Sequence, residues 1–94
     1  MDIGKPYPDT NVDIVSAKPL ENLCLLVEFA NGDIKTYDVK NIFDELPQFK
    51  VLEDINIFNG LKYGRYAVYW NDELDITETE LWYNGITYNP SDLK

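Results

Sequence analysis

Apolar and polar residues alternate most regularly in the segment Leu23–Asp38, on both sides of Asn31 and Gly32. Alternation with a period of two is typical of a β-strand that turns one face to the core and the other to solvent. Asn-Gly is the preferred pair for a two-residue type I′ turn, in which both central residues have positive φ. The pattern therefore predicts a β-hairpin, with Asn31 and Gly32 as structural residues of its turn.

A two-residue turn also fixes which residues of the hairpin face one another. It places Glu28 opposite Lys35 as an oppositely charged pair on the outer face, and it places Leu26 opposite Tyr37 on that same face. A slip of one residue would invert both faces. The apolar residues expected on the core face are Leu25, Val27, Phe29 and Ile34.

Two further segments extend the strand pattern. Val12–Lys18, ended by Pro19, predicts a first strand and so an antiparallel meander of three strands. In Leu61–Trp70, β-branched and aromatic residues alternate, which predicts a second hairpin in which Tyr69 points away from Val68.

Apolar residues spaced by three or four predict short helices in Val39–Leu46 and Phe49–Phe58, with a polar outer side. Thr77 and Glu80 have the spacing of a capping box, so Thr77 is a structural residue that would begin a third helix, and this helix would end at Gly85. The expected fold class is α+β: an antiparallel meander of three strands plus a second hairpin, with two or three short helices covering one face.

The chain has 94 residues, which favours one domain. We expect a single α+β domain over residues 12–88, after an extended N-terminal arm at 1–11 that contains Pro and Gly, and before a C-terminal tail at 89–94. Ile86 and Tyr88 would attach the end of the domain as an edge strand.

The composition is acidic, with 17 acidic and 8 basic residues and a formal net charge of −9. No two basic residues are adjacent, whereas nucleic-acid binding needs clustered Lys and Arg, so we expect no direct contact with nucleic acid. The acidic balance favours a basic protein partner. The chain also shows no signal-peptide pattern and no apolar run of transmembrane length, which predicts a cytoplasmic protein without membrane contact.

Candidate chemistry is limited to carboxylates, because the chain has no histidine and no nucleotide-binding glycine motif. We therefore expect no catalytic residues and no cofactor, and we interpret the single cysteine, Cys24, as a packing residue. Acidic residues are crowded between Asp72 and Glu80, where Asp72 and Asp75 are candidate ligands for calcium or magnesium, although the spacing does not match an EF-hand loop. We therefore predict no metal site and interpret these acids as solvated residues of a turn and of a helix start, with a structural role for Asp75 in capping backbone amides.

Seven tyrosines and two tryptophans suggest a surface for protein contacts, since both residue types are favoured at interfaces. The interaction candidates are Tyr37 and Tyr69, each expected on an outer sheet face, and Trp82. The alternative is that helices cover these side chains.

Most of the chain, from Val12 to Tyr83, resembles the bacterial domain-of-unknown-function family 2442. The residues that make the resemblance, in order, are Val15, Pro19, Leu25, Phe29, Asn31, Gly32, Asp38, Phe49, Leu52, Phe58, Trp70, Asn71, Asp75, Ile76, Leu81 and Trp82. The stretch that begins at the structural residue Trp70 matches best. The chain departs from the family at Glu73, where glycine is usual, at Glu78, where proline is common, and at Trp82, where tyrosine is usual.

The resemblance implies a small α+β domain without an established enzymatic activity. Members are often encoded beside small proteins of domain-of-unknown-function family 4160, in pairs that look like toxin–antitoxin modules. The first hypothesis is therefore a non-enzymatic, antitoxin-like interaction domain with a basic partner, with which a homodimer is compatible. The alternative is a small ligand- or cation-binding module that uses the carboxylates around Asp75. A small enzyme would need a concave site with carboxylates of perturbed pKa.

Overall fold

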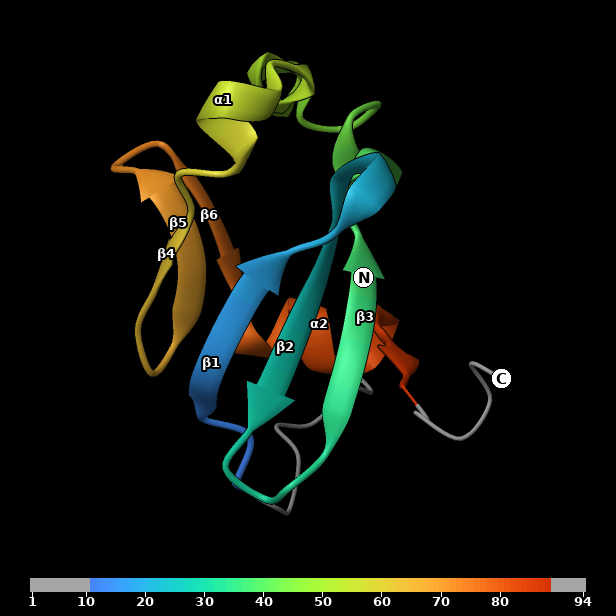
Figure 1. Cartoon of the computed structure of the whole chain (residues 1–94), viewed down its shortest axis with the longest axis vertical. Coiled ribbons are helices and arrows are strands. Elements are labelled where there is room, and N and C mark those ends of the chain that lie inside the picture. Colours follow the sequence, from blue (N-terminus) through green and yellow to red (C-terminus); the bar gives the residue numbers. More distant parts are fainter. Residues whose placement is uncertain (1–10, 89–94) are drawn as a thin grey trace.

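The structure is a computed structural model, and it describes residues 11–88. Within these residues the strands form two antiparallel sheets, ordered β1-β2-β3-β7 and β4-β5-β6 (Figure 1). The strands are β1 (Ile14–Pro19), β2 (Cys24–Phe29), β3 (Ile34–Asp38), β4 (Lys62–Tyr63), β5 (Ala67–Asn71), β6 (Leu74–Thr77) and β7 (Ile86–Thr87). The helical segments are η1 (Glu21–Leu23), η2 (Val39–Ile42), η3 (Pro47–Glu53), α1 (Ile55–Phe58) and α2 (Glu78–Asn84). The α+β class, the meander of β1, β2 and β3, and the second hairpin of β4 and β5 are confirmed.

The core lies between the inner face of the first sheet, α2 and the second sheet, while η3 and α1 bridge the two sheets at one end (Figure 1). Trp82 of α2 packs edge-on against Phe29 of β2, with ring centroids 5.3 Å apart. The indole of Trp70 stacks on Phe58 and donates a hydrogen bond to its carbonyl oxygen at 2.9 Å. Trp70 thus fastens α1 to β5, which agrees with the structural role expected for it.

The turn between β2 and β3 has three residues and not two. The amide of Phe29 donates to the carbonyl of Asp33, and the amide of Gly32 donates to the carbonyl of Phe29. Gly32 has φ +94°, whereas Asn31 is not among the described residues with positive φ. This geometry is a type I turn followed by a left-handed glycine, and it excludes type I′. Asn31 and Gly32 therefore lie in the turn as predicted, but Ala30 belongs to it as well, and the predicted turn type is wrong.

The extra turn residue shifts the pairing by one position and inverts β3. Leu25 faces Tyr37, and Glu28 faces Ile34. Tyr37 consequently lies in the core, 1% exposed, and Ile34 lies on the outer face beside Glu28. The predicted pair of Glu28 and Lys35 does not form, because Lys35 now projects toward α2.

β6 was not predicted, because its residues lie in the acidic stretch assigned to a turn and a helix start. Val68 faces Ile76, and Tyr69 faces Asp75, so β6 extends the second hairpin into a three-stranded sheet. The side chain of Asn71 accepts hydrogen bonds from two backbone amides of the tight β5–β6 turn. Asn71, and not Asp75, therefore performs the amide capping expected here.

α2 begins as predicted, since Thr77 is its N-cap and accepts a hydrogen bond from the amide of Glu80 at 3.3 Å. It ends where expected, with Asn84 as its last residue and Gly85 as its C-cap in an extended conformation at φ −77°. β7 then pairs with β3 as the predicted edge strand, with Ile86 opposite Thr36. The expected arm at 1–11 and tail at 89–94 lie outside the described residues, except for residue 11. Among residues 11–88, no helix is long and apolar enough to cross a membrane.

Candidate interaction surface

A groove runs between the segment that follows η2 and the corner where β6 passes into α2. It consists of two adjoining hollows that share Ile42, Glu45 and Glu80, and the larger has a volume of about 580 Å³. We call it the acidic groove. Its residues are Asn41, Ile42, Asp44, Glu45, Leu46, Asp75, Ile76, Thr77, Glu80 and Asn84.

Two helix caps place the walls of the groove. On one side the carboxylate of Asp38 accepts a hydrogen bond from the amide of Lys40, which begins η2 and directs the chain into the segment 41–46. On the other side Thr77 begins α2 and places Glu80 in its first turn. A carboxylate in the first turn of a helix also interacts favourably with the helix dipole.

The carboxylate of Glu80 is held from both sides. Tyr37 donates its hydroxyl hydrogen bond to Oε2 at 2.7 Å, and the amide of Asn84 donates to Oε1 at 2.9 Å. Burial first, and then the hydrogen bond and the charge of Glu80, raise the pKa of Tyr37 well above its ordinary value, so Tyr37 remains a hydrogen-bond donor. The chain itself therefore orients Glu80, and each of its carboxylate oxygens keeps a lone pair for a further donor.

The groove has a negative potential with an apolar base. Four carboxylates line it, those of Asp44, Glu45, Asp75 and Glu80, and none of the described lining residues is Lys or Arg. Ile42 and Ile76 supply apolar surface beside them. Such a site suits a cationic side chain with an apolar stem, since Lys and Arg bury their methylene groups while the charged end is paired.

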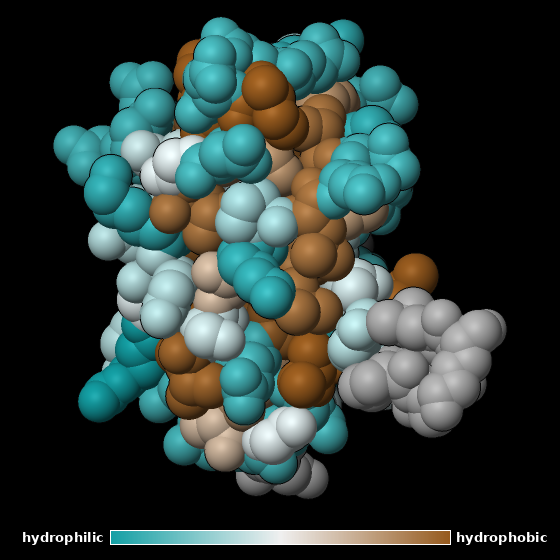
Figure 2. All heavy atoms as spheres, in the orientation of Figure 1, coloured by the Kyte–Doolittle hydropathy of each residue, from teal (hydrophilic) through white to brown (hydrophobic). Residues whose placement is uncertain are grey.

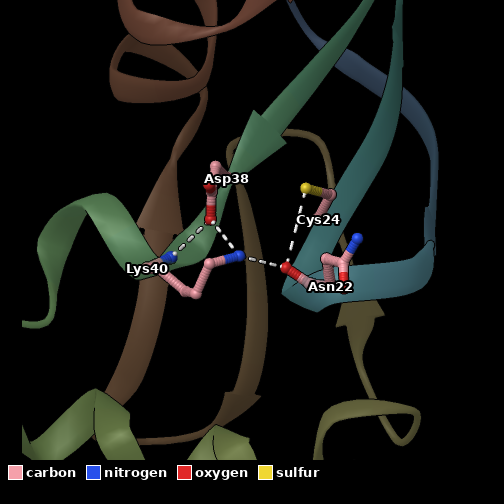
Figure 3. Close-up of polar contacts among 4 residues, drawn as sticks. All are labelled: Asn22, Cys24, Asp38 and Lys40. Carbon is pink, nitrogen blue, oxygen red and sulfur yellow. Dashed lines mark hydrogen bonds and ion pairs between the residues drawn. The ribbon is translucent and has the colours of Figure 1, made fainter.

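Lys40 is the basic residue closest in sequence to the groove, and its ammonium pairs with groups outside the groove. Lys40 reaches from η2 to the carboxylate of Asp38 at 3.0 Å and to the carbonyl oxygen of Asn22 in η1 (Figure 3). Cys24 approaches the same carbonyl at 3.7 Å, and burial raises the pKa of its thiol. Lys40 therefore ties η1 to η2 and neutralises Asp38, and it leaves the groove acids without this counterion.

The three predicted interaction residues have different positions. Tyr37 is buried, so its expected place on an outer face is wrong, and it reaches the surface only through Glu80. Trp82 packs against Phe29, with the ammonium of Lys35 4.1 Å from its ring, and so contributes to the core instead of an open surface. Tyr69 is 37% exposed and points away from the buried Val68, as predicted.

The candidate metal ligands are not brought together. Asp72 lies in the β5–β6 turn, and Asp75 lies on the outer face of β6 opposite Tyr69. Within residues 11–88, no group of three or more Cys, Asp or Glu side chains is arranged to hold a metal ion. The groove residues Asp44 and Glu45 were not singled out from the sequence, because only the fold brings them opposite Asp75 and Glu80.

Comparisons with known proteins find one family. The model of the family described as Protein of unknown function (DUF2442) matches residues 14–87, which are most of the chain. No curated protein and no solved structure matches the chain.

Proposed function

The chain belongs to the family of Protein of unknown function (DUF2442), and from its own surface we propose that it is a non-enzymatic domain that binds a basic protein partner in the acidic groove. The observation on which this rests is the set of four groove carboxylates without a cation in the lining. A charge pair between a groove carboxylate and a Lys or Arg of the partner should be weakened by salt, because Asp44, Glu45 and Asp75 are exposed. The net charge of −9 would also attract a basic partner from a distance.

The apolar base favours a protein over a simple ion as the ligand. Leu46 is one of the exposed large apolar residues, and it stands beside Glu45 at the groove. A partner side chain such as Arg would place its stem against this surface and its guanidinium at the carboxylates. We further propose an antitoxin-like role, in which the domain covers a basic functional surface of a small partner protein.

The test is affinity capture of the tagged chain from lysate of its native cells at low and high salt. Charge reversal by Glu45→Lys should weaken recovery of a basic protein by about tenfold or more, since it replaces an attraction with a repulsion of a few kcal/mol. Glu53→Lys is the matched control, because it makes the same change at an exposed position of η3 that is not a groove residue.

Recovery of the basic protein by the wild type at low salt, its loss at high salt, and its loss with Glu45→Lys alone would support the proposal. Equal loss with both variants would mean that only the net charge matters, and the groove would not be the site. The antitoxin-like role further requires that the recovered protein alone is toxic on expression and that co-expression of the chain removes this toxicity.

A further inference from the structure

Independently of the groove, we propose that the outer face of the first sheet is a contact surface for a second copy of this chain. This outer face is formed by residues that alternate with the core residues of β1, β2, β3 and β7. They are Ser16, Lys18, Cys24, Leu26, Glu28, Ile34, Thr36 and Ile86.

No helix in the described part of the chain covers this face, because α2 lies on the opposite side of the sheet (Figure 1). Figure 2 looks onto the face and shows apolar side chains running along it between polar ones. Leu26 lies at its centre, between Lys18 and Thr36 on the neighbouring strands. An antiparallel sheet with one solvated face is normally polar on that face, so apolar residues here need an explanation.

The outer face also contains two hollows near Leu26. One hollow is lined in part by Leu26, Glu28 and Ile34. The other, which is mainly apolar, is lined by Leu20, Glu21, Cys24, Thr36 and Tyr88. Beyond it Ile86 of the edge strand is 72% exposed. A face with hollows, the exposed side chain of Ile86 and the partly exposed side chains of Leu26 and Ile34 can interlock with a copy of itself.

The charges on the outer face favour a second copy as the occupant. Two chains of net charge −9 repel each other, so they can associate only where carboxylates are balanced by cations. On this face Lys18 and Glu28 are diagonal neighbours on β1 and β2, and Asp38 at its border is paired with Lys40. A two-fold axis near Leu26 would bring each Lys18 to the Glu28 of the other copy, as an isologous interface requires.

The edges of this sheet are less suited to self-association than its face. β1 has a register shift between Ile14 and Ser16 and ends at Pro19, and β7 has only the two residues Ile86 and Thr87. Bulges, proline and short edge strands are devices that prevent pairing between sheets. The face is therefore the surface to test.

The experiment is sedimentation equilibrium of the purified full chain over a wide range of concentration. We expect a dimer, and Leu26→Glu should raise its dissociation constant by about tenfold or more, because it places a carboxylate at the centre of an apolar contact. Ile55→Glu is the control, since it makes a similar change at a half-exposed residue of α1 outside this face. Circular dichroism on each variant confirms that it folds.

Charge exchange gives a second, independent readout. Lys18→Glu alone should weaken the dimer, and adding Glu28→Lys to it should restore the affinity, because the pair is only reversed. A wild type that stays monomeric at every concentration would overturn the proposal, as would a Leu26→Glu variant whose dimer has the same dissociation constant as that of the wild type. Binding in the acidic groove is probed by Glu45→Lys, so failure of one proposal is distinguishable from failure of the other.

Discussion

Tyr37 connects the core to the surface through one hydrogen bond. Its ring is buried opposite Leu25, and its hydroxyl donates to Glu80 at the groove. Tyr37→Phe keeps the ring and removes the donor, so we expect a loss of about 1–3 kcal/mol in the free energy of unfolding. Urea unfolding measures this loss. Tyr69→Phe, at an exposed position, is the control and should change the stability little.

The raised pKa of Tyr37 makes stability depend on pH in the alkaline range. In the unfolded chain the phenol ionises near its ordinary pKa of about 10, while in the folded chain it keeps its proton. The unfolded state therefore loses a proton that the folded state retains, and stability should fall as pH rises above about 10. The melting temperature of Tyr37→Phe should fall less steeply there than that of the wild type. If the melting temperatures of the two proteins fell equally steeply with pH, the alkaline loss of stability would not come from Tyr37.

The positions of Tyr37 and Lys35 show what could not be predicted at the residue scale. The sequence shows the alternation along β3. Which of its side chains face the core, however, depends on one additional residue in the turn. Lys35 faces inward, where its ammonium donates to the carbonyl oxygen of Trp82 at 2.6 Å and burial lowers its pKa. Contacts between residues 47 positions apart in sequence leave no local signal.

At the scale of elements, the join between α2 and β7 depends on Gly85. A Cβ atom there would lie 2.4 Å from the carbonyl oxygen of Leu81 and 3.2 Å from the carbonyl oxygen of Thr36. Gly85→Ala should therefore destabilise the fold by about 1–3 kcal/mol, since the backbone of α2 or β3 must move. Chemical denaturation measures it. Gly64→Ala should be nearly neutral, because a Cβ atom at that position would have no neighbour within 4 Å; equal effects would argue against close packing at Gly85.

Elements with a clear local signal were predicted, whereas the strand β6 was not. The start of α2 follows from Thr77 and Glu80, which lie within one helical turn of each other. β6 was missed because its alternating pattern, with Leu74 and Ile76 buried, is short and is flanked by acids. The acidic groove was missed for another reason, because its two walls come from segments far apart in the sequence.

At the scale of the whole molecule, the net charge of −9 should destabilise the folded state through self-repulsion. Adding NaCl screens this repulsion, so the melting temperature should rise with ionic strength until screening is complete. MgCl₂ at the same ionic strength should raise it by a similar amount. A clearly larger effect of magnesium would instead favour the alternative cation-binding function, because a ligand that binds only the folded state stabilises it.

The loop at residues 30–32 must keep its length of three residues, although it lies at the surface. Loops at a surface ordinarily tolerate the loss of one residue. Here the deletion of one codon would leave a two-residue connection, and the pleat would then turn every side chain of β3 to the opposite side. Tyr37 would leave the core, and Glu80, on a different element, would lose its donor. A deletion in this loop would thus alter the acidic groove, although the loop contributes no residue to it.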